Sequence, residues 1–142
     1  MRLAPFALLL GTLALGACDD NNDVINSLPI TGSWALRSTN GVSVPAVIDQ
    51  SDSPPLVVAV INGRLDVNSD GTFSRTLTFR RSLSGTETVF AVTCAGTYTN
   101  VNGDATFTED GSSPDCSSSF DAVQVDNQMT TDRDGVVDFW IR

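Results

Sequence analysis

Short runs of alternating apolar and polar residues, broken at close intervals by glycine, asparagine and aspartate, fill the chain from residue 30 onward. A period of two places successive side chains on opposite faces of a strand, whereas an amphipathic helix needs an apolar stripe with a period of 3.6 residues. The alternating runs are rich in Thr, Val and Phe, so they predict β-strands. The expected strands cover residues 31–39, 56–61, 63–68, 72–81, 86–94, 96–101, 104–109, 119–126, 127–131 and 135–141.

Four dipeptides are expected to form tight turns between these runs: Asn62-Gly63, Asp70-Gly71, Asn102-Gly103 and Asp134-Gly135. Asn, Asp and Gly tolerate the positive φ angles that two-residue hairpins require, so neighbouring strands should pair. Many such strands hide their edges by closing into a barrel or by stacking as a sandwich. We therefore expect an all-β fold, an antiparallel up-and-down barrel of about 8–10 strands, with a β-sandwich as the alternative.

The alternation also predicts which side chains point inward. In the run 72–81, Phe73, Arg75, Leu77 and Phe79 share one face. The last run repeats the pattern, with Val137, Phe139 and Ile141 on its apolar face. Residues 56–61 are apolar throughout and should be covered on both faces. Residues 45–55 contain Pro54-Pro55, which excludes a central strand, so a long connection is expected there rather than a lid over a barrel mouth.

An apolar leader precedes the alternating region. Arg2, the apolar run 3–15 and the small pair Gly16-Ala17 have the order of a targeting signal. The run is shorter than the roughly 20 apolar residues that cross a membrane. The segment Leu15-Gly16-Ala17-Cys18 resembles the lipobox of bacterial lipoproteins, which implies cleavage before Cys18 and a diacylglycerol on its sulfur. An ordinary secretory signal, cut near Gly16 or after Ala17, is the alternative.

This assignment divides the chain into a signal peptide at 1–17, a lipidated cysteine with a flexible acidic linker at 18–29, and a barrel domain at 30–142. Each buried methylene of an acyl chain such as palmitate contributes about 0.8 kcal/mol, so two chains hold a protein firmly. The expected location is therefore the bacterial cell membrane, inner or outer, with the domain anchored by lipid on the exported side.

Charge excludes several classes of partner and chemistry. The 142 residues hold 17 acidic and 8 basic side chains, and losing the leader removes one arginine, which takes the net charge from −9 to −10. Such a chain has too few cations to displace the counterions of nucleic acid. It contains no histidine and no lysine, so the usual nucleophilic triads and general bases are missing. We expect no enzymatic activity, no cofactor and no nucleic-acid partner.

Cysteine parity agrees with the lipid anchor. Of three cysteines, lipid on Cys18 leaves Cys94 and Cys116. Export to an oxidising compartment favours a disulfide between them, and closing a loop of this length stabilises a domain by roughly 3 kcal/mol in the chain-entropy model. Two separate buried thiols are the alternative.

The first expected strand carries a family resemblance. Gly32-Ser33-Trp34 resembles the Gly-x-Trp strand of lipocalins, and the segments 38–45, 63–66 and 70–73 are similar to those of lipocalin-like domains in bacterial lipoproteins. The resemblance implies a barrel in which Trp34 plugs one end while the other end opens to a cavity. It also implies binding of a small apolar or amphipathic molecule.

The residues expected to line such a cavity are the inward-facing ones: Trp34, Phe73, Arg75, Leu77, Phe79, Phe90 and Tyr98. Arg75 is the charge that could meet an acidic head group; alternatively it lies at the barrel rim and reaches water along its apolar stem. The competing function is a structural or interaction module, in which a filled barrel meets another envelope protein.

A calcium-binding role is a weaker alternative. Asp66, Asn68 and Asp70, followed by Gly71, match the first half of a calcium loop. The bidentate glutamate expected at its twelfth position is replaced by Leu77. The segment also lies between two expected strands, so a hairpin turn accounts for it better and no metal site is predicted.

Overall fold

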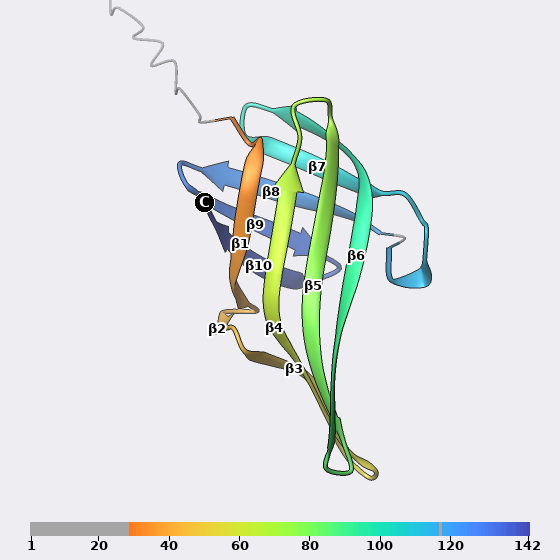
Figure 1. Ribbon diagram of the computed structural model, residues 1–142. Coiled ribbons are helices and arrows are strands. Elements are labelled where there is room, and N and C mark those ends of the chain that lie inside the picture. The colour runs from red at the N-terminus through yellow and green to blue at the C-terminus, as the bar shows by residue number, and fades with distance from the viewer. Residues whose placement is uncertain (1–28, 117) are drawn as a thin grey trace, which may run out of the picture.

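The computed structural model describes residues 29–116 and 118–142. The predicted signal peptide, Cys18 and the linker up to residue 28 lie outside the described residues. Eight strands form a closed antiparallel barrel, in which β1 (Gly32–Thr39) pairs with β10 (Val136–Ile141) on one side and with β4 (Pro55–Val67) on the other (Figure 1). Between β4 and β10 the wall follows chain order through β5 (Thr72–Leu83), β6 (Thr86–Val101), β7 (Asp104–Glu109), β8 (Ser119–Val125) and β9 (Gln128–Arg133). The closed ring confirms the predicted barrel and excludes the sandwich.

Three of the four predicted turns join neighbouring strands. Asp70-Gly71, Asn102-Gly103 and Asp134-Gly135 each contain at least one residue with positive φ. The fourth prediction is wrong, because Asn62 and Gly63 lie within the continuous strand β4, next to a bulge at Ile61. A Cβ atom at Gly63 would lie 2.7 Å from the Leu36 Cβ, so the glycine is needed for close packing of β1 rather than for a turn.

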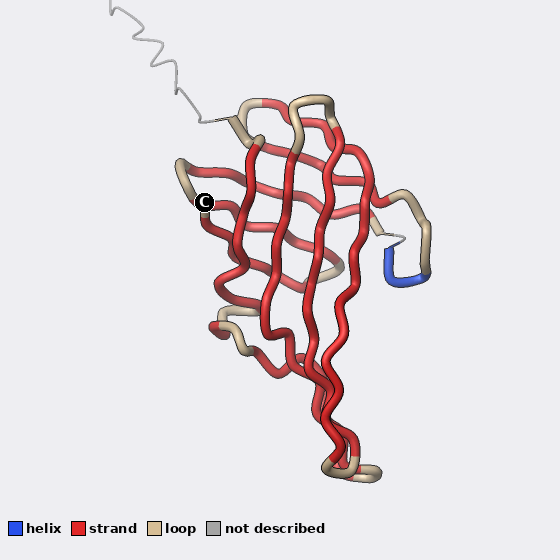
Figure 2. Tube along the Cα trace, in the orientation of Figure 1, coloured by secondary structure: helices blue, strands red, loops and turns tan. Residues whose placement is uncertain are grey.

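Two strands are longer than the sequence predicts. Runs 56–61 and 63–68 form the single strand β4, and runs 86–94 and 96–101 form the single strand β6. A glycine does not end a strand when a neighbouring strand continues the hydrogen-bond ladder across it, as β5 does opposite both Gly63 and Gly96. Figure 2 shows the strand trace running unbroken along these two elements.

The far ends of the long strands leave the barrel as an extension that we call the tongue. It consists of β3 (Ala46–Asp52), residues 55–60 of β4, 79–83 of β5 and 86–90 of β6, in the sheet order β3-β4-β5-β6 (Figure 1). The expected long connection at 45–55 is therefore mostly the edge strand β3, while Pro54 lies in the following turn and Pro55 is the first residue of β4, a position that proline tolerates. The apolar run 56–61 is not covered on both faces, since Val57 is 41% exposed.

The barrel interior at the end away from the tongue is packed solid. Trp34 and Trp140 are 1% and 0% exposed, and the ring of Phe107 packs edge-on against Phe73 and stacks on Phe120. The Trp34 Nε1 donates to the Ile30 carbonyl, and Arg142 lies over the Trp34 ring. This end is therefore closed by the indole, the entering chain and the terminal arginine.

The predicted faces of β10 are reversed. Asp138 and Trp140 point into the barrel and are buried, while Val137 is 39% exposed. The pattern of β10 is apolar on both faces except at Asp138, so alternation alone assigned the polar residue to the outside. Trp140 fills the core instead and donates its Nε1 proton to Thr131.

A 3₁₀ turn, η1 (Pro114–Cys116), lies between β7 and β8, and a two-residue strand, β2 (Val42–Ser43), pairs with the end of β1. Within residues 29–116 and 118–142, no helix is long and apolar enough to cross a membrane.

Candidate ligand site

A cavity of about 460 Å³ lies where the barrel opens onto the tongue. Volumes of this size are typical of sites for small molecules. One wall comes from β3 to β6, and the facing wall comes from the loop around η1 and from the turn between β9 and β10. A second cavity of about 230 Å³ adjoins it and shares Ile48, Leu77, Phe79 and Arg133 with it. We call the two together the mouth.

The tongue wall of the mouth is apolar and open to solvent. Ile48 is 47% exposed and Phe90 is 41% exposed. The rings of Phe79 and Phe90, which are directly opposite in β5 and β6, stack at 5.4 Å between centroids. Leu77 and Val92 continue this surface inward. Exposed apolar side chains that gather in a concave wall are typical of ligand sites, because their contact with water is unfavourable.

A buried ion pair forms the floor of the mouth. Arg75 is 4% exposed, and its Nη2 donates to Oε1 of Glu109, whose side chain is fully buried. Glu109 also accepts from the backbone N–H and the hydroxyl of Ser118, at 3.3 and 2.9 Å. Arg75 thus lies inside the barrel and not at a water-exposed rim. Burial, helped by the nearby charge of Arg133, lowers the pKa of Arg75, and Glu109 opposes that effect.

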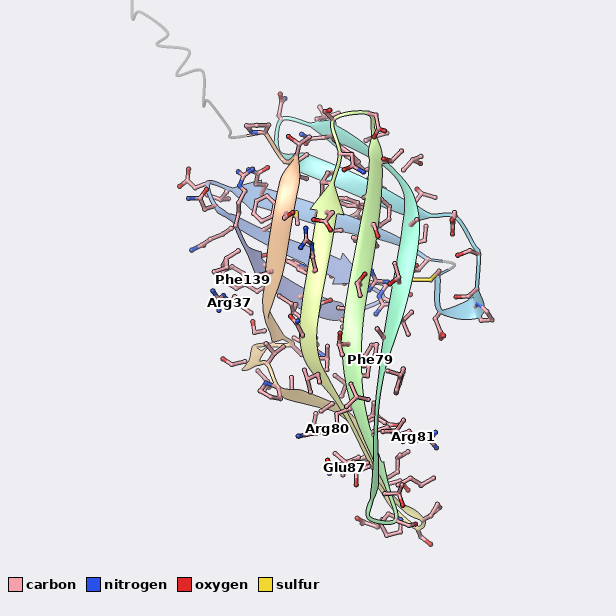
Figure 3. The ribbon with its side chains drawn as sticks, viewed as in Figure 1. Arg37, Phe79, Arg80, Arg81, Glu87 and Phe139 are labelled. Atoms are coloured by element: carbon pink, nitrogen blue, oxygen red, sulfur yellow. A yellow bond between two sulfur atoms is a disulfide. The ribbon has the colours of Figure 1, made fainter. Side chains whose placement is uncertain are left out.

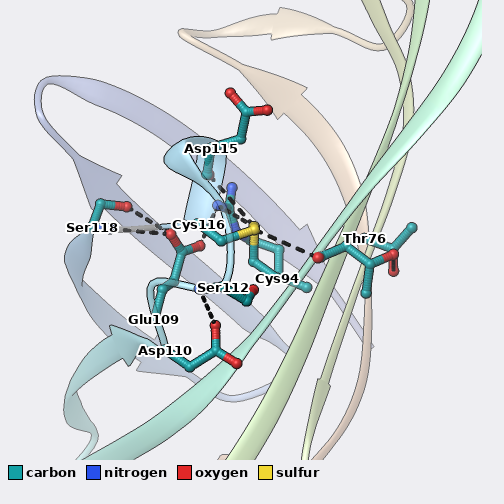
Figure 4. The surroundings of a disulfide bond; sticks show 10 residues. Thr76, Cys94, Glu109, Asp110, Ser112, Asp115, Cys116 and Ser118 are labelled. Carbon is teal, nitrogen blue, oxygen red and sulfur yellow. Dashed lines mark hydrogen bonds and ion pairs between the residues drawn. A yellow bond between two sulfur atoms is a disulfide. The ribbon is translucent and has the colours of Figure 1, made fainter.

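The predicted disulfide between Cys94 and Cys116 is confirmed. It ties η1 to β6, and Figure 4 shows Glu109 and Ser118 beside it. Backbone bonds from Gly111 to Cys116 and from Asp110 to Ala95, at 2.8 and 2.9 Å, hold the same loop. The disulfide therefore fixes the facing wall of the mouth against the strand that carries Phe90.

Two further charged residues, Asp138 and Arg133, lie near the floor of the mouth. Asp138 is 5% exposed and accepts from the Thr39 hydroxyl at 2.8 Å. Burial raises the pKa of Asp138, and the Thr39 hydrogen bond and the charges of Arg133 and Arg75 oppose the rise. The side chain of Arg133 has no hydrogen bond or ion pair within the part of the chain that the structure describes. Arg133 lines both cavities of the mouth.

The raised pKa of Asp138 predicts how stability depends on pH. A carboxyl that binds its proton more tightly in the folded state destabilises the fold once it ionises. The destabilisation by Asp138 should therefore decrease as the pH falls through its folded pKa toward the unfolded value of about 3.8. Asp138→Asn, which can still accept from Thr39, should therefore raise the free energy of unfolding at pH 7, and the gain should shrink to zero as the pH approaches 4. Urea unfolding across this pH range measures the difference.

Asp66→Asn is the matched control with the opposite sign. Hydrogen bonding from Arg64 lowers the pKa of Asp66, so this variant should be less stable than the wild type at pH 7, and the loss should vanish as the pH falls. Equal pH profiles for the two variants would contradict the assignment of Asp138 as a carboxyl held in an unfavourable environment.

The residues predicted to line a cavity divide into two groups. Arg75, Leu77, Phe79 and Phe90 come together in the mouth. Trp34, Phe73 and Tyr98 belong to the packed end of the barrel, where the Tyr98 hydroxyl donates to the Asn68 carbonyl. Trp34 thus occupies the closed end, as the resemblance implied.

Several lining residues were not anticipated, among them Ile48, Val58 and Arg133. Ile48 and Val58 lie on tongue strands whose pairing depends on a bulge between Val47 and Asp49. Arg133 precedes a turn, where a charged residue is ordinary, and its position opposite Arg75 follows from closure of the barrel. An unbroken apolar run in 56–61 was the available signal for the tongue wall.

The weak calcium candidates have other partners. Asp66 binds Arg64 through its side chain at 2.7 Å and also accepts from Ser33. Asp70 accepts from the backbone and hydroxyl of Thr72, which lowers its pKa, and Asn68 donates to the same hydroxyl. Among the described residues, no group of three or more His, Cys, Asp or Glu side chains is placed to hold a metal ion. The segment 66–72 is a hairpin turn.

Comparison of the chain with protein-family models, with curated proteins and with solved structures finds no match.

Proposed function

We propose that this protein is a lipoprotein of the bacterial cell envelope whose barrel binds one small apolar or amphipathic molecule without catalysis. The observation that carries the proposal is the mouth, where an apolar wall lies open to solvent while the other end of the barrel is packed. A barrel filled throughout by its own side chains would leave no such wall. The proposed ligand covers Phe79, Phe90 and Ile48.

Two features support the anchor. The lipobox-like residues 15–18 place a lipid-acceptor cysteine eleven residues before Pro29, where the described chain begins. That chain enters at the closed end, where Arg142 donates to the carbonyls of Pro29 and Thr31 (Figure 1). A tether at the closed end leaves the mouth at the opposite end of the barrel, free to meet a ligand away from the anchoring lipid.

A protein-interaction role is the second candidate, and the outer face of the tongue favours it. Val47, Ala59, Arg80 and Val89 form one row across four strands on the face opposite to Phe79. Val47 and Val89 are 54% and 60% exposed. Figure 3 shows Arg80 and Arg81 leaving opposite sides of the tongue. Apolar residues that gather on an exposed face are typical of contact surfaces.

One preparation tests the anchor and supplies the protein for the ligand-binding measurement. The wild-type protein from a membrane fraction should have the intact mass of a chain that starts at Cys18 and carries acyl groups. The Cys18→Ser protein should carry no acyl groups and should stay in solution without detergent. A wild-type chain with an unmodified Cys18 would contradict the anchor and leave the ligand question to the next measurement.

Fluorescence titration of the Cys18→Ser protein with N-phenyl-1-naphthylamine, an uncharged apolar probe, tests binding. A saturable increase with one site is expected. Phe90→Ser in this background should weaken binding about tenfold, because partial burial of a phenyl ring contributes about 1.5 kcal/mol. Val89→Ser is the matched control, since Val89 lies next to Phe90 on the opposite face. Absence of saturable binding, or equal losses in the two variants, would overturn the proposal.

A further inference from the structure

The floor of the mouth holds a donor that the fold does not use. Arg75 Nε is buried and has no hydrogen-bond partner among the described residues, although Nη2 of the same guanidinium is bound to Glu109. Arg75 lines the larger cavity of the mouth. Buried donors are almost always paired, and a buried guanidinium N–H without a partner is costly. A group that accepts a hydrogen bond at this point would remove that cost.

A second arginine lines the same space from the other wall. Arg133 lines both cavities of the mouth, and Arg75 lines the larger of the two together with it. Its charge is close enough to lower the pKa of Arg75. Two like charges that line one cavity repel each other, so an anion that binds between them is favoured.

The negative charges nearby limit the charge of the anion that can bind at this floor. Glu109 is already bound to Arg75 and Ser118, and Asp138 to Thr39. Asp115 and Asp134 line the outer part of the mouth and are exposed. A ligand with a single negative charge fits this balance, whereas one with several charges would meet the carboxylates.

We propose that the mouth takes a single-chain amphiphile with its head inward, a monoanionic oxyanion head group accepting hydrogen bonds from Arg75 Nε and Arg133 while the alkyl tail lies along Phe79 and Phe90. The inference rests on the proposed ligand-binding function. It adds the chemical class of the ligand and its direction in the site. A carboxylate head meets the single-charge requirement at neutral pH, whereas a phosphate monoester carries nearly two negative charges, although guanidinium binds both.

Displacement of N-phenyl-1-naphthylamine from the Cys18→Ser protein by decanoate, decyl phosphate and decanol tests the proposal, because the three share one tail. Decanoate should compete about tenfold more strongly than decanol, as expected for a charged hydrogen bond in a buried site. Decyl phosphate, which carries nearly two negative charges at pH 7, should compete less strongly than decanoate, and stronger competition by decyl phosphate would contradict the single-charge head group. Equal competition by all three would overturn the inference while leaving apolar binding intact.

Arg133→Gln should reduce the preference for the acidic ligand to less than about twofold over decanol, because one of its two charged donors is lost. Arg81→Gln is the matched control. Arg81 pairs with the cavity residue Val58 on the same face of the sheet, is exposed and lies outside the mouth. It should keep the preference of the parent protein. Equal losses in both variants would indicate general attraction by charge and contradict the floor site, and failure of the probe itself to bind would contradict the proposed function.

Discussion

Replacing Glu109 by leucine should lower the free energy of unfolding by about 3–5 kcal/mol, because it leaves the guanidinium of Arg75 charged and unpaired inside the barrel. The side chains of the pair are 5% and 0% exposed, so water would solvate the remaining charge poorly. The Ser118 hydroxyl and N–H lose their acceptor at the same time. Urea unfolding of the two proteins at one pH measures the difference.

The double variant Arg75→Met with Glu109→Leu separates the cost of an unpaired charge from that of a cavity. It should recover most of the lost stability, since replacing both members of a buried pair by apolar residues is often neutral or stabilising. Asp66→Asn is the exposed control, because Arg64 and Asp66 form an ion pair at the surface and should contribute at most about 1 kcal/mol at pH 7. A loss at Glu109 no greater than that at Asp66 would mean that water reaches the barrel floor.

Gly96→Ala should destabilise the barrel by about 3 kcal/mol, the upper end of the usual cost of overpacking. A Cβ atom at this position would lie 2.0 Å from the Thr108 carbonyl oxygen and 2.9 Å from Glu109 Cα, and both are backbone atoms of β7. It would also lie 2.8 Å from the Phe73 ring. Strands β6 and β7 must move apart to accept the methyl group, next to the buried ion pair.

Thr99→Ala provides the comparison for Gly96→Ala on the same strand. Thr99 is exposed and pairs with Thr106, so its loss should change the stability by no more than about 0.5 kcal/mol. Chemical denaturation of the three proteins gives both values. A Gly96→Ala protein as stable as Thr99→Ala would show that the contact between β6 and β7 adapts freely.

Much of the wall could be predicted because its signals are local. The alternation in β5 correctly placed Phe73, Arg75 and Leu77 on the inner face, since neighbouring side chains of a strand point in opposite directions whatever the fold. The turns could also be predicted from a local signal, because Asn, Asp and Gly tolerate positive φ angles in any fold. The roles of Gly63 and Gly96 could not be predicted, because these glycines are required by the close approach of other strands and not by a turn.

The candidate site could be predicted only in part. Strand periodicity predicted that Arg75 faces inward and that the apolar side chains of Phe79 and Phe90 face inward with it. Neither Glu109 nor Arg133 could be assigned to Arg75, because they lie 34 and 58 residues further along the chain and meet it only when the barrel closes. The split of the inward residues between a packed end and an open mouth likewise depends on where each strand crosses the barrel.

The sequence by itself determined the strand-rich class and three of the hairpin turns, and it predicted the pairing of Cys94 with Cys116 by assigning Cys18 to a lipid. These depend on backbone propensity, on φ preferences and on the small number of possible partners. Only the tertiary structure decided that the sheet closes through β1 and β4, that four strands extend beyond it as a tongue, and that Asp138 and Trp140 face inward. Alternation defines two faces of a strand, but which face becomes the interior is decided by the volume that the other strands leave to be filled.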